Sequence, residues 1–144
     1  MDMVNFMREN GQTEVCEADF YFVIKFFDSD EDGKLNYPDF LQMILPCTNS
    51  KLRSQTTQRV MGDCRPTDFL TLDVEQDMTR LFQMEIIMHK ESENLKQRFE
   101  SHMDYTPQAS YNCVDNAAIG FIDIKGFDNF FKRLFSKGIE LEDN

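Results

Sequence analysis

The residues of this chain best suited to chemistry are three aspartates at alternate positions, Asp28, Asp30 and Asp32. Carboxylate oxygens are the ligands that hard divalent cations prefer, and alternate residues of a tight turn can direct them toward one point. Gly33 follows directly and can take the positive φ that lets the chain double back around an ion. The spacing therefore predicts a loop that binds a metal ion. The alternative is a surface turn between two helices that holds no metal.

The predicted loop extends to residue 39 and supplies three further oxygen donors. Lys34 offers its backbone carbonyl, and Asn36 binds directly or through a water molecule. In twelve-residue calcium-binding loops the last ligand is usually Glu, which gives the ion two oxygens. The shorter Asp39 tends to give only one, and this favours Mg²⁺ relative to Ca²⁺. We therefore expect one Ca²⁺ site of moderate or weak affinity, with Mg²⁺ as a competitor. The predicted ligands are Asp28, Asp30, Asp32, Lys34 (backbone carbonyl), Asn36 and Asp39.

Amphipathic helical patterns flank the loop on both sides. Pro46 ends the second helix, and Pro38 lies in its first turn, where a missing N–H costs little. Leu35 is the apolar residue that we expect to enter a short strand and pair with a second loop. The apolar residues are Phe20, Val23, Ile24 and Phe27 before the loop, and Phe40, Met43 and Ile44 after it.

A second loop of the same length spans residues 115–126. Gly120 and Ile122 hold the places of Gly33 and Leu35, so we expect the shape of a helix–loop–helix, with an unrelated hairpin as the alternative. Thr106 and Pro107 have the pattern of an N-cap and first residue of the entering helix. This loop should not hold calcium, because residues without a side-chain ligand occupy three of its ligand positions: Ala117, Ile119 and Gly126.

The middle of the chain differs in composition from both ends. Residues 48–72 form the net-basic stretch, which we interpret as a solvated connector, with a partner-binding segment as the alternative. A long helix is predicted over residues 73–103, starting at Asp73 with Gln76 as its capping partner. We leave open whether this helix packs on its own chain or on a partner. Its heptad seam consists of Val74, Met78, Leu81, Glu85, Met88, Ser92, Leu95 and Phe99.

The composition excludes several classes of function. A net charge of −11 disfavours nucleic acid and anionic membrane surfaces. The sequence contains neither a membrane-length apolar run nor a signal-peptide pattern, and its four cysteines form no CxxC pair, so we expect a cytoplasmic protein with reduced thiols. No nucleophile–base grouping or phosphate loop is evident, so we expect no enzymatic activity. We interpret His89 and His102 as exposed helix residues and not as ligands.

These patterns resemble the EF-hand superfamily, including calmodulin-like proteins, over roughly residues 1–45 and 105–138. The stretch 40–47, followed by Leu52-Arg53, a long charged helix and Asp104-Tyr105-Thr106-Pro107, also resembles multi-EF-hand proteins of protists. That resemblance implies a link to ciliary or cytoskeletal assemblies. It also implies an all-α fold in which two helix–loop–helix units pair through a short two-stranded β contact, with the long helix interposed.

The expected function is a non-enzymatic calcium-binding protein that docks on a protein partner through its hydrophobic lobe or its long helix. The alternative is a constitutive structural subunit of a larger assembly, independent of calcium. The loop of 28–39 is expected to pair with that of 115–126 within one lobe, or else with a loop of a second chain. The predicted segments are the competent hand 1–47, the basic connector 48–72, the long helix 73–103, the degenerate hand 104–138 and an acidic tail 139–144.

Overall fold

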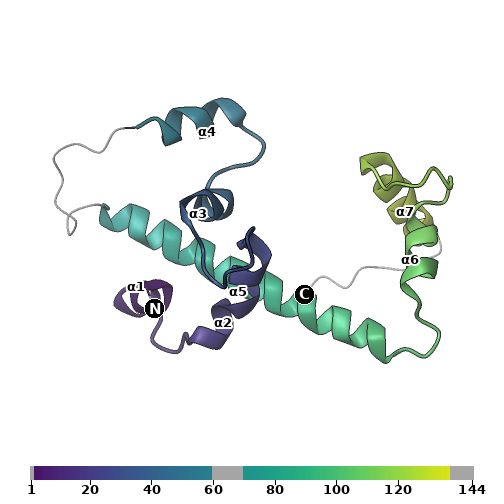
Figure 1. Ribbon diagram of the computed structural model, residues 1–144, viewed down its shortest axis with the longest axis horizontal. Helices are drawn as coiled ribbons and strands as arrows, with labels where there is room; N and C mark the ends of the chain where they lie inside the picture. The colour runs from purple at the N-terminus through teal and green to yellow at the C-terminus, as the bar shows by residue number, and fades with distance from the viewer. Residues whose placement is uncertain (1, 60–69, 137–144) are drawn as a thin grey trace. The chain divides into compact units, whose positions relative to one another are not determined.

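The computed structural model describes residues 2–59 and 70–136, and the regular elements in these ranges are all α-helices. The expected all-α class is confirmed for this part of the chain. The chain divides into two units, Met1–Asn94 and Leu95–Asn144, with the boundary inside the longest helix. The helices, labelled in Figure 1, are α1 (Asp2–Glu9), α2 (Glu17–Phe27), α3 (Tyr37–Ile44), α4 (Ser50–Thr57), α5 (Leu72–Ser101), α6 (Pro107–Val114) and α7 (Ile124–Ser136).

The core of the first unit lies where α1, α2, α3 and α5 meet. Phe82 of α5 is at its centre, because its ring packs edge-on against Phe6 (centroids 5.7 Å apart) and Phe20 (6.3 Å). Such edge-to-face pairs stabilise a core beyond the area that they bury. The helices on both sides of the predicted metal loop are thereby fixed to one core. Its buried apolar residues are Val4, Met7, Phe20, Val23, Met43, Phe82 and Ile86.

Helix α5 presents one face to this core, and some of its other apolar side chains are exposed. Thr79, Phe82 and Ile86 are buried, at the three- and four-residue spacing of one helix face. The predicted heptad seam lies beside that face, and Met88 within it is exposed. An ion pair between Lys90 Nζ and Asp19 Oδ1 (2.7 Å) joins α5 to α2 at the edge of the core. The expected helix over 73–103 thus lies at Leu72–Ser101.

One interpretation from the sequence is wrong: His89 is not an exposed helix residue. Its side chain is only 12% exposed, and its ring packs 4.6 Å from that of Phe26. Its Nε2 lies 3.2 Å from Glu85 Oε2, one turn earlier in α5. The packing of α2 across α5 covers this pair, which the pattern of α5 alone could not reveal. His102, in contrast, is exposed.

In the second unit, a loop joins α6 to α7. The expected N-cap is confirmed, since Thr106 Oγ1 accepts a hydrogen bond from the Ala109 N–H (3.2 Å) and Pro107 is the first helical residue. Arg133 of α7 donates a hydrogen bond to the Cys113 carbonyl of α6. A stripe of α7 is exposed, at spacings of three and four residues: Ile124, Phe127, Phe131 and Phe135.

Several expectations stay predictions. No strand is assigned in residues 2–59 and 70–136, and the two loops belong to different units, so neither the β contact at Leu35 nor the pairing in one lobe is tested. The centre of the basic connector, with Cys64, and the acidic tail 139–144 lie outside the described residues. Cys16, Cys47 and Cys113 are free and exposed thiols. Within the described ranges, no helix is long and apolar enough to cross a membrane.

Candidate metal centre

The three alternate aspartates of the sequence converge in the loop between α2 and α3. One carboxylate oxygen from each of Asp28, Asp30 and Asp32 can be chosen so that all three lie within 4.8 Å of one another. Asp28 follows the last residue of α2 and is half-buried, whereas Asp30 and Asp32 are exposed. In the part of the chain that the structure describes, this is the one group of acidic, histidine or cysteine residues close enough to share an ion.

Asp28 holds the loop in this shape through backbone hydrogen bonds. Its Oδ2 accepts from the Gly33 N–H at 2.7 Å, and its Oδ1 accepts from the Asp32 N–H at 3.3 Å. Gly33 has a φ of 82°, and Glu31 also adopts a positive φ, of 59°. The Lys34 N–H donates to Asp32 Oδ1 at 2.8 Å, while the Lys34 residue itself is exposed. The chain therefore turns back on itself around the Asp28 carboxylate.

The remaining two predicted ligands, Asn36 and Asp39, lie at the start of α3 and form its capping box. Asn36 Oδ1 accepts from the Asp39 N–H (3.0 Å), and Asp39 Oδ2 accepts from the Asn36 N–H (3.3 Å). Asp39 Oδ1 also accepts a hydrogen bond from Ser29 Oγ at 2.7 Å, and Asp39 is only 2% exposed. The structure thus ties Asp39 into the loop without including it in the group of three.

The close carboxylates shift the pKa values of two members of the group. Desolvation raises the pKa of Asp28, but hydrogen bonds from the Gly33 N–H and from Asp30 outweigh it, so the net shift is downward. The pKa of Asp30 is raised, first by its hydrogen bond with Asp28, then by desolvation and by the nearby charge of Asp32. When two carboxyl groups lie close together, ionisation of one disfavours ionisation of the other, so their pKa values move in opposite directions. The group therefore concentrates negative charge that a cation would neutralise.

The loop at residues 115–126 has the same backbone geometry. Asp115 Oδ2 accepts from the Gly120 N–H at 2.8 Å, and its Oδ1 accepts from the Ile119 N–H at 3.0 Å. The positive-φ residues also recur at the same two positions, Ala118 (52°) and Gly120 (86°). Asp123 Oδ1 accepts from the Gly126 N–H at 2.8 Å, at the place where Asn36 caps α3. The two loops thus share one backbone conformation.

The side chains of the two loops differ in chemistry. Where the first loop has Asp30 and Asp32, the second has Ala117 and Ile119, and Ile119 is exposed. A cation in the second loop would find a carboxylate at its first position and few further side-chain oxygens. The common backbone makes the second loop an internal comparison for the first.

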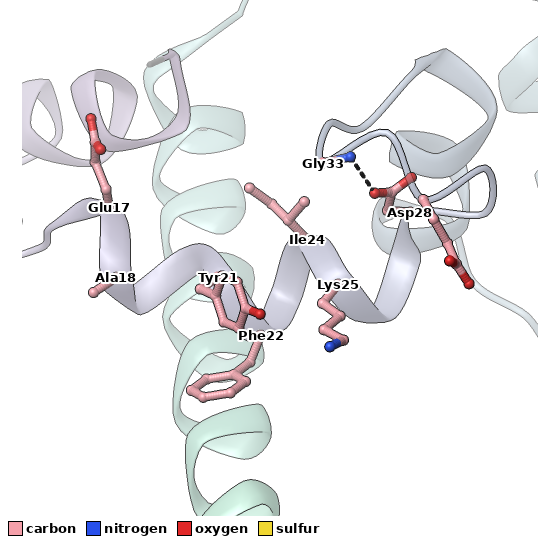
Figure 2. Close-up of a pocket in the computed structure, with 9 residues that line it drawn as sticks. Glu17, Ala18, Tyr21, Phe22, Ile24, Lys25, Asp28 and Gly33 are labelled. Carbon is pink, nitrogen blue, oxygen red and sulfur yellow. Dashed lines mark hydrogen bonds between the residues drawn. The ribbon is translucent and has the colours of Figure 1, made fainter.

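An open groove of about 1010 Å³ runs along α2 and ends at the first loop. Tyr21, Phe22 and Ile24 are the large apolar residues among those that line it. At its far end it is lined by loop residues that include Asp28 and Gly33. Figure 2 shows Tyr21 and Phe22 projecting from α2, and the Gly33 N–H directed at the Asp28 carboxylate beyond the end of the helix. A change in the loop would therefore alter one wall of this groove.

Sequence reasoning missed the role of Ser29, whose hydroxyl hydrogen-bonds to Asp39. It also treated Asn36 and Asp39 only as ligands, although an Asn followed three residues later by an acidic residue is close to the sequence signature of a capping box. No protein-family model, curated protein or solved structure matches this chain.

Proposed function

We propose that this chain is a non-enzymatic calcium-binding protein whose loop 28–39 holds one ion, as the EF-hand resemblance implies. The observation that carries the proposal is the comparison of the two loops. Both adopt the same turn around an initial aspartate, yet only the first directs three carboxylates toward one point. Such a turn forms without extra acidic residues, since Asp115 and Gly120 suffice for it in the second loop. The carboxylate of Asp30 is therefore not needed for the turn, and that of Asp32 adds only a hydrogen bond from the Lys34 N–H; metal binding would explain both charges.

The proposed ligands are those of the sequence motif. Asp28, Asp30 and Asp32 supply carboxylate oxygens. The Lys34 backbone carbonyl and Asn36 supply two further oxygens. Asp39 is the sixth, but its two oxygens already accept hydrogen bonds from Ser29 and from the Asn36 N–H. An ion must share or replace these bonds, which favours weak or moderate affinity. The short arm of Asp39 also keeps Mg²⁺ as a competitor.

Metal binding in this proposal tunes a docking surface for a protein partner. The groove along α2 supports this, because Asp28 and Gly33 of the loop line it together with apolar residues of the helix. The long helix α5 offers a second surface. The β contact between the loops, made within one lobe or with a second chain, belongs to the same proposal, because each loop would otherwise leave a strand edge unpaired.

The second candidate is a constitutive structural subunit of a ciliary or cytoskeletal assembly, with metal absent or permanently bound. One observation favours this candidate: Asp115 and Gly120 maintain the same turn in the second loop, which has few ligands for an ion. In that case the loops serve as rigid connectors between helices, and calcium changes nothing.

Calcium titration of the full chain, followed by circular dichroism and by a dye that reports exposed apolar surface, separates the two. The proposed function predicts a change that Asp28→Ala abolishes and that Asp115→Ala, the matched change in the second loop, preserves. If calcium changes neither signal in the wild-type chain, the result supports the structural subunit. A change that survives Asp28→Ala and is lost in Asp115→Ala would contradict the assignment of the ion to the first loop.

A further inference from the structure

The side chain of Ser29 joins the two ends of the loop 28–39. Its hydroxyl donates a 2.7 Å hydrogen bond to Oδ1 of Asp39, which lies in the first turn of α3. The other carboxylate oxygen, Asp39 Oδ2, accepts a hydrogen bond from the Asn36 N–H at 3.3 Å. Asp39 is only 2% exposed. Both oxygens of this buried carboxylate are therefore engaged by the protein itself.

The turn of the loop does not depend on this contact, as the second loop shows. There Asn116 holds the place of Ser29, and Gly126, which has no side chain, holds the place of Asp39. The turn around Asp115 nevertheless forms, closed by a hydrogen bond from the Gly120 N–H at 2.8 Å. What the Ser29 hydroxyl fixes is therefore the carboxylate of Asp39, and not the shape of the turn.

The two oxygens of Asp39 have different surroundings. Oδ2 bonds to the backbone at the start of α3, where it belongs to the capping box. Oδ1 bonds to Ser29, which lies between Asp28 and Asp30 in the sequence. An ion held by the three alternate aspartates would therefore meet Asp39 at Oδ1, the oxygen that the hydroxyl occupies. Asp39 itself lies outside the group whose oxygens are within 4.8 Å of one another, which consists of Asp28, Asp30 and Asp32.

We propose that Ser29 sets the metal affinity of the loop 28–39, because its hydroxyl and the ion compete for Oδ1 of Asp39. This inference deepens the proposed function and rests on it, since without an ion at the loop there is no competition. Ser29 is a positioning residue: it holds Asp39 and does not bind the ion. Binding of the ion breaks the bond, and the hydroxyl of Ser29, an exposed residue, then bonds to water.

The competition has a thermodynamic consequence that a purely structural contact lacks. Part of the free energy of ion binding is used to break the bond between Ser29 and Asp39. Loss of the hydroxyl should therefore destabilise the metal-free chain and strengthen metal binding by the same free energy. Both Ca²⁺ and Mg²⁺ displace the hydroxyl, so the ratio of their affinities should stay as in the wild type. That ratio depends on the length of the side chain at residue 39.

The first test is isothermal titration of the full chain with CaCl₂ and, separately, with MgCl₂. Ser29→Ala removes the competing hydroxyl and should lower the Kd of both ions about five- to tenfold. Ser29→Thr retains a hydroxyl that can donate to Asp39 and should keep the wild-type Kd. Asn116→Ala is the matched control, because it truncates the same position of the second loop, and it should leave both Kd values unchanged.

Urea denaturation of the same chains tests the metal-free state. Without metal, Ser29→Ala should have a lower urea midpoint than the wild type, because Oδ1 of the buried Asp39 loses its partner. At saturating Ca²⁺ the two midpoints should coincide, because the ion has replaced the hydroxyl in both chains. A merely structural role of Ser29 would lower the midpoint equally with and without calcium.

The possible outcomes separate this inference from the proposed function. Calcium binding by the wild type and by Ser29→Ala with equal Kd, or weaker binding by Ser29→Ala, would overturn the role of Ser29 and leave the metal site standing. Tighter binding by Ser29→Thr, equal to that of Ser29→Ala, would show that the hydroxyl is not the cause. Absence of binding in the wild type and in Ser29→Ala would overturn the proposed function and this inference together.

Discussion

The Gly33 N–H donates a 2.7 Å hydrogen bond to Asp28 Oδ2, and this contact closes the loop between α2 and α3. It requires Gly33 to adopt a φ of 82°, in the left-handed region where a side chain is strained. Gly120 and Asp115 make the same contact at 2.8 Å in the second loop. One backbone device therefore forms both turns, and acidic residues at neighbouring positions distinguish them.

Replacing Gly33 by alanine should destabilise the first unit by about 1 kcal/mol, as measured by urea denaturation. The cost is conformational, because a Cβ at this position would meet nothing within 4 Å. Gly126→Ala is the control: Gly126 has a helical conformation, and its nearest neighbour would lie 3.5 Å away, in ordinary contact. That substitution should be neutral or mildly stabilising. Equal losses from both variants would show that the left-handed conformation is not the cause.

The ion pair between Lys90 and Asp19 should make the stability of the first unit depend on pH in acid. The hydrogen bond from Lys90, with a second from the Cys16 N–H, lowers the pKa of Asp19 from 3.8 to about 2. Because the pKa is lower in the folded state, the stabilisation is present above about pH 4 and is lost as the pH falls toward 2. Lys90→Met should therefore lower the urea midpoint at about pH 6 and have little effect near pH 2. An undiminished difference at low pH would contradict the ion pair.

Truncation of Phe82 should be the most damaging change in α5. Its side chain is 2% exposed and packs against the rings of Phe6 and Phe20, so Phe82→Ala should cost about 3–5 kcal/mol of unfolding free energy. Ile87→Ala on the exposed side of the same helix should change it by less than about 0.5 kcal/mol. Chemical denaturation monitored by circular dichroism measures both. Similar losses from the two variants would mean that the core does not use the face of α5 that contains Phe82.

Lengthening the side chain at residue 39 should change metal preference. Asp39→Glu adds one methylene, and a glutamate at this place can give an ion two oxygens instead of one. We expect Ca²⁺ affinity to rise about tenfold relative to Mg²⁺. Competition between the two ions in a calcium titration measures the ratio, with Ser29→Ala as a control that removes a hydrogen bond to Asp39 without lengthening it. An unchanged ratio would exclude Asp39 as a ligand.

The sequence predicted the helices best where a helical repeat of apolar residues began or ended at a recognisable capping residue or proline. The stripes around the first loop correspond to α2 and α3, and Thr106 with Pro107 marked the start of α6. In α5 the pattern was ambiguous, because two apolar faces lie side by side on one helix. The seam through Met88 has the stricter repeat, yet the core of the first unit uses Phe82 and Ile86. The choice depends on which face matches α1 and α2, and no local pattern carries that information.

The candidate site was predictable in its first half. Asp28, Asp30 and Asp32 converge because alternate residues of a turn closed by Gly33 share one side. The second half was harder to predict, because Asn36 and Asp39 also cap α3. Capping and metal binding use the same side-chain oxygens, so the sequence does not distinguish the two roles. The burial of His89 was missed because a tertiary contact with Phe26 of α2 covers it. The pattern of α5 alone contains no sign of that contact.

Isothermal titration of the full chain with CaCl₂ tests the central claim most directly. The account predicts one binding site per chain, lost or weakened at least about tenfold by Asp30→Asn, which removes one charge and leaves the Gly33 contact to Asp28 in place. Asp123→Asn, the control in the second loop, should bind as the wild type does. No binding by the wild-type chain, or binding that Asp30→Asn leaves unchanged, would contradict the account.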